Sequence, residues 1–262
     1  MRIPFTRPET TLLLAVAALL ALALLGPFVS QPADAHGFAD RRAWGGLPNA
    51  LDVLSNLPFA IAGAWGLLVL RRARAGPLFA MQRACAALFF AGLLVTAAGS
   101  TWYHLAPDDI GLAVDRTAMS VAFAGLLGLL AAARVSDRAG LALAAVALVA
   151  GPMSVFVWSS TGNVLAWAVV QFGGMAVVLL VLATGAERLA TLPVRWGRVL
   201  AIYAIAKLLE LGDHAILEAG GELLSGHSLK HVVAAFAAWP VIAALAVPHR
   251  PQNGVQTAVQ AA

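Results

Sequence analysis

Eight stretches of the 262-residue chain are long and apolar enough to cross a lipid bilayer, which constrains the fold more than any other feature. Hydrophobic residues make up 61% of the chain and charged residues 11%, whereas soluble domains have about 45–50% and 25%. Since apolar spans of this length form helices in lipid, we predict an all-α membrane protein. The predicted spans are 11–29, 53–70, 83–99, 112–133, 140–158, 164–183, 196–212 and 229–247.

The first span has the features of a secretory signal as well as those of a membrane anchor. Arg2 and Arg7 precede it, and the small residues Ala33 and Ala35 follow it like a cleavage site. Its apolar run exceeds the about 7–15 residues of a usual signal core, so residues 1–35 are either a signal peptide or an anchor helix. In both cases we predict a seven-transmembrane-helix bundle within residues 36–250 and a polar cytoplasmic tail at 251–262.

Charge predicts the orientation of the bundle. The acidic residues Asp108, Asp109, Glu218 and Glu222 lie in one set of alternate connections, where only Arg41 and Arg42 break the pattern. By the positive-inside rule the other set, with the C-terminus, faces the cytoplasm. The net charge of +4 therefore describes topology rather than nucleic-acid binding, which needs arginines clustered with aromatic residues. The predicted cytoplasmic arginines are Arg2, Arg7, Arg71, Arg72, Arg74, Arg83, Arg134, Arg138, Arg188, Arg195, Arg198 and Arg250.

Three histidines near the ends of apolar spans indicate a metal site. His104 follows Ser100 by four residues, and His231 follows His227 by the same spacing. A spacing of four places both members of a pair on one face of a helix. Imidazole is a common zinc ligand, and three protein ligands with one open position are typical of a catalytic zinc centre. If the two helices meet, the sequence predicts a zinc site inside the bundle.

With the predicted topology, the other polar groups of the apolar stretches fall at the same face of the membrane, and none at the cytoplasmic ends. Charged groups inside a membrane are costly and usually mark function. Ser100 is a candidate catalytic residue, although it could instead cap its own helix. Asp115 is a second candidate catalytic residue, although it could instead only neutralise Arg116. Asn56 could tie helices together, and the remaining groups could form an internal charge network. The predicted supporting network is Asn56, Arg116, Lys207, Glu210, Asp213 and Lys230.

Three motifs resemble those of the alkaline ceramidases, which belong to a superfamily of seven-span hydrolases that also includes the adiponectin-type receptors. The motifs are Ser-Asn-Leu-Pro-Phe at 55–59, Ser100-x-x-x-His104 followed by Asp115, and His227-x-x-x-His231. The resemblance implies a zinc ion held by the three histidines, with Ser100 and Asp115 beside it, and hydrolysis of a lipid amide.

Those ceramidases also bind calcium through an acidic cluster before the first core span. This chain offers Asp40, Asn49 and Asp52 in that region, with fewer carboxylates, so the sequence gives little support for calcium. The N-terminal span and the arginine-rich loops are not part of the family pattern.

The residues also suggest a mechanism. Zinc with three neutral imidazoles lowers the pKa of its water to about 7 and supplies hydroxide. Asp115 could accept the proton of that water or orient a histidine, and the Ser100 hydroxyl could donate to the oxyanion. Substrate entry from the bilayer favours a lipid amide over a soluble peptide, either ceramide or a related N-acyl lipid.

Two other classes stay open at this point. A zinc-stabilised seven-helix receptor or lipid-binding protein would hold the metal without turnover. A transporter could use the charged groups as a relay, although such sites usually lie near the midplane. The N-terminal segment resembles a bacterial secretion signal, so we expect the protein in a bacterial inner membrane with its active site toward the periplasmic face. The sequence does not give the oligomeric state.

Overall fold

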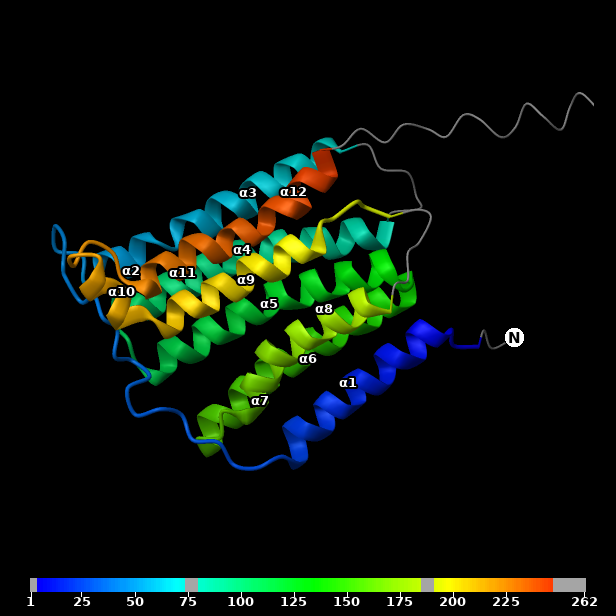
Figure 1. The fold of residues 1–262 in the computed structure, drawn as a ribbon, viewed down its shortest axis with the longest axis horizontal. Coiled ribbons are helices and arrows are strands. Elements are labelled where there is room, and N and C mark those ends of the chain that lie inside the picture. Colours follow the sequence, from blue (N-terminus) through cyan, green and yellow to red (C-terminus); the bar gives the residue numbers. More distant parts are fainter. Residues whose placement is uncertain (1–3, 74–79, 185–190, 247–262) are drawn as a thin grey trace, which may run out of the picture.

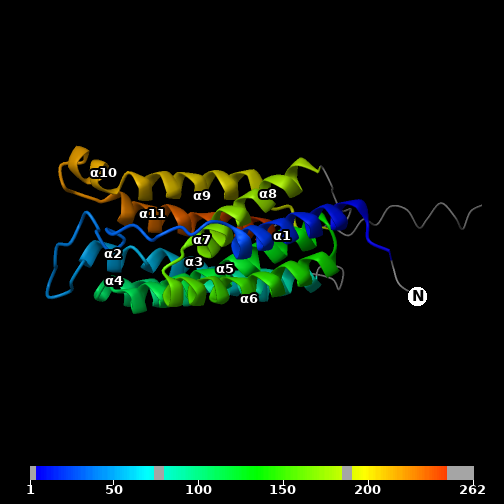
Figure 2. The same cartoon turned by 90° about the horizontal axis from the view of Figure 1, so that it is seen from below.

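The computed structural model describes residues 4–73, 80–184 and 191–246. All regular structure in these residues is helical, apart from two isolated β-bridges. The helices lie roughly along one common direction and form an elongated bundle (Figures 1 and 2). This confirms the prediction of an all-α protein.

The chain runs through the following elements in order: α1 (Arg7–Leu25), α2 (Ala50–Leu54), α3 (Leu57–Arg72), α4 (Ala80–Leu105), α5 (Asp109–Arg134), α6 (Asp137–Thr161), α7 (Leu165–Ala168), η2 (Val169–Gly173), α8 (Gly174–Ala183), α9 (Trp196–Leu211), α10 (Asp213–Ala219), α11 (Gly226–Ala235), η3 (Phe236–Ala238) and α12 (Trp239–Ala246). Several of these continue one another. The segments Ala50–Arg72, Leu165–Ala183 and Gly226–Ala246 each form one span.

Seven helical segments of the described chain are long and apolar enough to cross a membrane, and α1 is one of them. The protein is therefore an integral multi-pass membrane protein. All eight predicted stretches form helices, but the stretch at 196–212 is shorter than expected. It forms α9, whose 16 residues are one fewer than predicted and below the about 17–25 of a usual membrane span. Here the helix ends at Leu211, and Gly212 separates it from α10.

Small residues allow α4 and α5 to pack closely. A Cβ atom at Gly92 of α4 would lie 2.4 Å from the backbone nitrogen of Ala122, and one at Gly125 of α5 would lie 2.2 Å from that of Phe89. Side chains at these two positions would therefore force the helices apart, as is typical of helix contacts in membranes. The close contact fixes the end of α4 relative to the start of α5, where Ser100, His104 and Asp115 lie.

The two ends of the bundle differ in charge. At the end where α1 begins and α3 finishes, which we call the arginine end, lie Arg7, Arg71, Arg72, Arg83, Arg134, Arg138, Arg195 and Arg198 (Figure 1). Arg2, Arg74, Arg188, Arg250 and the predicted tail at 251–262 lie outside the described residues. The opposite end, which we call the site end, holds the C-terminus of α4 and the N-termini of α5 and α11.

The expectation that buried polar groups are confined to the site end is wrong. Glu9 of α1 is buried at the arginine end, where its carboxylate pairs with the Arg138 guanidinium and accepts a 2.5 Å hydrogen bond from the Ser136 hydroxyl. Gln82 of α4 is also buried there, and its side-chain oxygen accepts from the backbone N–H of Leu192 at 2.8 Å. Both groups are satisfied by partners far away in the sequence, which the pattern of a single span does not reveal.

Candidate metal centre

Three histidine rings converge at the site end of the bundle. The candidate ligand atoms of His104, His227 and His231 all lie within 4.8 Å of one another, and all three side chains are buried. The Nε2 atoms of His104 and His227 are 3.3 Å apart. The ring centroids are separated by 4.8–5.0 Å. The predicted meeting of the two histidine helices is thus present in the structure.

The start of α11 places two of these histidines. Ser225 is the N-cap, and its hydroxyl oxygen accepts from the backbone N–H of Ser228 at 3.0 Å. The helix therefore begins at Gly226, so that His227 and His231 share the face toward α4. Gly226 also permits the close approach of α9, because a Cβ atom there would lie 2.2 Å from the carbonyl oxygen of Leu209.

The third histidine lies in the last turn of α4, where backbone carbonyls lack partners within the helix. The Asn49 side-chain amide donates to the carbonyl oxygen of His104 at 2.9 Å. The segment that precedes α2 is thereby attached to the end of α4. This bond fixes the backbone from which the His104 ring projects.

Ser55 determines which nitrogen of His231 is available to a ligand. Its hydroxyl donates to the carbonyl oxygen of Asp52 at 2.9 Å, and its oxygen lies 2.8 Å from Nδ1 of His231. Since the one hydroxyl proton is already used, the oxygen accepts from Nδ1–H. The lone pair of His231 is then on Nε2, which is the tautomer that a metal ligand needs.

The convergence of the three rings fits a metal ion. One proton shared between His104 and His227 would satisfy that pair, but it would leave the nearby lone pair of His231 without a donor. A cation at the common centre satisfies all three nitrogens. Three imidazoles with space for a further ligand are the donor set of catalytic zinc sites.

The residues that the resemblance would assign to calcium are partly engaged in other contacts. Both carboxylate oxygens of Asp40 are bound by the Arg42 guanidinium, at 2.8 and 2.7 Å. The Asn49 amide group is turned to His104, and one oxygen of Asp52 accepts from the Ser228 hydroxyl at 2.6 Å. The other carboxylate oxygen of Asp52 is buried and has no hydrogen-bond partner among the described residues.

A small polar cavity lies one helical turn deeper than the outer histidines. It has a volume of about 50 Å³ and is lined by Ser100, Asp115 and His231, among others. The Ser100 hydroxyl is adjacent to the Asp115 carboxyl group, and both residues are buried. Since a cavity needs about 10–15 Å³ to hold a water molecule, this one is large enough for water. The two predicted catalytic residues thus lie beside the histidine cluster and in contact with the same space.

Three charged side chains line the same cavity from α9 and α11. The Glu210 carboxylate binds the Lys230 ammonium group at 2.6 Å and also pairs with Lys207. One acid between two bases gives these three side chains a net positive charge, which faces the Asp115 carboxyl group in the same cavity. These residues form the internal charge network that the sequence predicts.

The other members of the predicted network lie elsewhere. Asp213 binds two backbone N–H groups, that of His227 at 2.7 Å and that of Ala39 at 2.9 Å. Arg116 lies over the ring of Trp158, with its guanidinium carbon 4.3 Å from the ring centroid. Asn56 is buried, and its amide donates to the carbonyl oxygen of Asp52 within the same helical segment.

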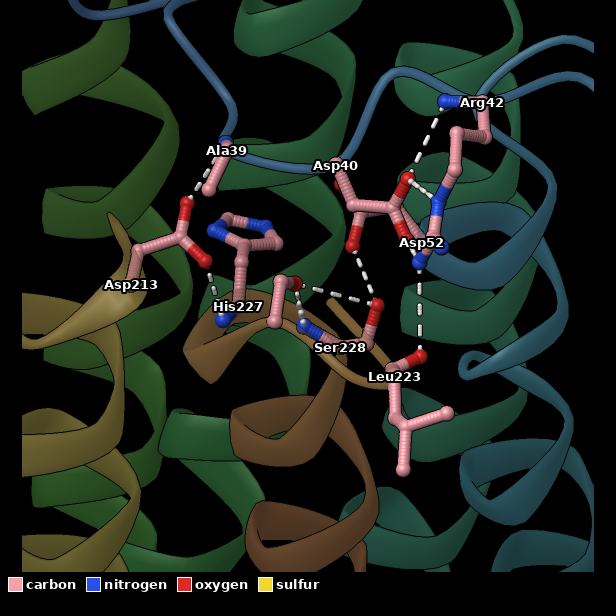
Figure 3. A network of polar contacts seen from close by, with 9 residues as sticks. Ala39, Asp40, Arg42, Asp52, Asp213, Leu223, His227 and Ser228 are labelled. Atoms are coloured by element: carbon pink, nitrogen blue, oxygen red, sulfur yellow. Dashed lines mark hydrogen bonds and ion pairs between the residues drawn. The ribbon is translucent and has the colours of Figure 1, made fainter. Parts of the chain in front are cut away.

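A segment before α2, which includes Ala39 and Asp40, passes over His227 (Figure 3). The buried ring of Phe38 packs edge-on against His104 and His227, with ring centroids 4.7 and 4.5 Å apart. Two sets of polar contacts hold the segment. The backbone N–H of Ala39 donates to the Asp213 carboxylate. Asp40 pairs with Arg42, whose guanidinium also donates to the carbonyl oxygen of Leu223 at 3.3 Å. The Arg42 guanidinium lowers the pKa of the Asp40 carboxyl group.

The sequence pattern did not single out Phe38, Asp52 or Ser228 as parts of this site. Phe38 and Asp52 precede the apolar region, and nothing in their spacing indicates a contact with a distant helix. Ser225 carries a recognisable signal, since a serine directly before a helix is a preferred N-cap. Ser228, three residues later, follows from the geometry of that cap.

No model of a known protein family matches the chain, and no curated protein sequence matches it. The resemblance to the alkaline ceramidases therefore rests on the three motifs alone. What the structure adds is that it brings the residues of those motifs together in a multi-pass membrane protein with a buried three-histidine cluster.

Proposed function

We propose that this protein is a zinc-dependent amidohydrolase of the membrane, which cleaves the amide bond of ceramide or of a related N-acyl lipid. The observation that carries the proposal is the position of the histidine cluster directly beside a buried cavity that contains a carboxyl and a hydroxyl group. A metal site with only a structural role has no need of such a cavity, because structural zinc is enclosed by four protein ligands.

His104, His227 and His231 would hold the zinc. When bound by three neutral imidazoles, zinc lowers the pKa of a water ligand to about 7 and polarises a carbonyl group. Ser55 keeps His231 in the required tautomer by accepting its Nδ1–H. The proton transfers and the stabilisation of the developing negative charge would fall to other residues of the chain.

Asp115 is the candidate general base, because its carboxyl group lies in the cavity where an attacking water would be placed. The adjacent Ser100 hydroxyl would donate to the oxygen of the scissile carbonyl as that oxygen becomes negative. The net positive charge of Lys207, Glu210 and Lys230 at the cavity wall favours the same negative charge. The protonated Asp115 can then return a proton to the leaving amine.

The depth of the site favours a lipid substrate. Ser100 lies five residues before the end of α4, about 7.5 Å along the helix, and Asp115 six residues after the start of α5, about 9 Å along it. Phe38 covers the histidines toward the bundle end. An amide that reaches this position from the bilayer carries an apolar chain, which a soluble peptide lacks.

The test uses the full-length protein in lipid nanodiscs, with measurements of bound zinc and of hydrolysis of a panel of N-acyl lipids that includes ceramide. His231→Ala is expected to lose most of the zinc. Asp115→Asn is expected to keep zinc and lose about 10²–10⁴-fold in turnover, and Ser100→Ala about 10²–10³-fold. Ser160→Ala, an exposed serine whose hydroxyl bonds only within its own helix, is the matched control and should behave like the parent.

Two results would contradict the proposal. Full zinc occupancy in His231→Ala would contradict the metal site. A parent protein that binds zinc but hydrolyses no member of the panel would instead support the alternative, a zinc-stabilised receptor or lipid-binding protein.

A further inference from the structure

A large apolar groove lies between α1 and the rest of the bundle. Its volume is about 590 Å³, within the about 300–1,000 Å³ of typical ligand sites. Helix α1 forms one wall with Val16, Leu19 and Leu24, and the facing wall comes from α6, η2 and α8. Because this part of the chain lies in the membrane, the molecules that match such a lining are the hydrocarbon chains of lipids.

The groove adjoins a smaller cavity in the interior of the bundle. A smaller apolar cavity of about 60 Å³ lies between α5, α8 and α9, and it shares Leu127, Val170 and Gly174 with the groove. The same cavity shares Gln171 and Tyr203 with the polar cavity beside the histidines. The three spaces therefore adjoin one another in series between the candidate active site and the groove beneath α1, with shared residues in the walls between them.

The backbone between the two apolar spaces is irregular at the point where they meet. Val169–Gly173 form one π-helical turn, a feature that is often found at functional sites. Gly174 follows directly and contributes no side chain to the shared wall. A Cβ atom there would have only Leu127 within 4 Å among the atoms around it, at 3.5 Å, so the wall is open enough to accept added atoms.

Polar contacts hold α1 at both of its ends. At the arginine end the Glu9 carboxylate is bound by Arg138 and Ser136. At the site end the backbone N–H of Val29 donates to the Asn163 side chain at 3.1 Å, and its carbonyl oxygen accepts from Val164 at 2.8 Å. The helix is thus fixed beside α6 to α8 (Figure 1). The groove runs along the second half of the helix.

We propose that the groove and the interior cavity bind the hydrocarbon chain of the substrate, which extends from the polar cavity past Gly174 to the space beneath α1. This inference rests on the proposed function and adds to it the site for the apolar part of the substrate. It also assigns a role to residues 1–35. Since α1 forms one wall of the site, it is retained in the mature protein as an anchor helix and is not removed as a signal peptide.

The decisive experiment compares long-chain and short-chain N-acyl substrates with the same head group. Gly174→Leu places a side chain in the shared wall and should lower kcat/KM for the long-chain substrate by at least about tenfold, as expected for added atoms in a filled apolar pocket. Short-chain hydrolysis should stay at the parental rate. Gly197→Leu is the matched control, because a Cβ atom at Gly197 has open space around it, and both substrates should be hydrolysed at the parental rate.

A second variant tests the other wall. Leu19→Trp fills the groove from α1 and should have the same selective effect, whereas Leu14→Trp, on the exposed face of α1, should not. An equal change for both substrates in Gly174→Leu and Leu19→Trp would overturn the proposal, as would a mature protein that begins after residue 35. If the parent protein hydrolysed neither substrate, the proposed function would fail instead, so the two failures are distinguishable.

Discussion

Ser55→Ala should weaken metal binding without removing any metal ligand. The Ser55 oxygen lies 2.8 Å from Nδ1 of His231, and the serine hydroxyl is committed to the carbonyl oxygen of Asp52. In the alanine variant Nδ1–H loses the Ser55 oxygen as its acceptor in a buried environment, and the backbone of Asp52 is the group that remains beside the ring. The imidazole can then place its proton on either nitrogen, and only one of the two tautomers binds a metal through Nε2.

The structure sets the size of this effect. A buried hydrogen-bonding group without a partner costs about 1–3 kcal/mol. The loss of a group that orients a metal-bound histidine typically lowers metal affinity about 10–100-fold, which corresponds to about 1.4–2.8 kcal/mol. The two ranges agree, so we expect a zinc dissociation constant about 10–100-fold higher than that of the parent.

The assay is competition for zinc between the purified protein and a chelator of known affinity. Ser154→Ala is the matched control, since Ser154 is also buried in a helix but its hydroxyl donates to Gly151 of the same helix. Ser55→Thr retains the hydroxyl and should restore most of the affinity. An unchanged zinc affinity in Ser55→Ala would refute the assignment of the tautomer.

Three further predictions concern other parts of the molecule. Asp40→Asn should lower the melting temperature at neutral pH but not in strong acid. The Arg42 partner lowers the pKa of Asp40, so the stabilisation from their ion pair is lost as the pH falls through the lowered pKa. An equal loss of melting temperature at all pH values would contradict this prediction. With Asp109→Cys, an impermeant thiol reagent should label intact cells, and with Arg72→Cys it should not; the reverse labelling would invert the orientation. Gly226→Ala should lose bound metal, because the added Cβ atom would lie 2.2 Å from a backbone oxygen of α9; metal analysis at the parental level would contradict this.

The sequence was sufficient to predict the helices and the histidine cluster, for two physical reasons. Apolar length determines where a chain can cross a bilayer, so the spans follow from composition. A spacing of four residues places His227 and His231 on one face of their helix, and a short outer connection between spans places Ser100 near Asp115. Both inferences use local geometry, and both are independent of the details of packing.

The details that complete the site depend on contacts between distant segments. The bond from Ser55 to His231 joins α11 to the C-cap of α2, and the cover formed by Phe38 depends on the path of an irregular segment. The burial of Glu9 requires that α1 lies beside α6, which no property of the N-terminal apolar run specifies. Periodicity reports which face of a helix is apolar, but it does not report which helix that face meets.

The arrangement of the histidine cluster separates two directions of approach. Phe38 closes the side toward the bundle end, and the ties from Asp213 and Arg42 hold that cover in place. The polar cavity lies on the other side, one turn deeper, and shares wall residues with the apolar cavity beyond it. A lipid amide that arrives from the membrane would therefore meet the metal from the side on which Asp115 and Ser100 lie. The cavity is small, at about 50 Å³, so a reacting water in it would lie close to both groups.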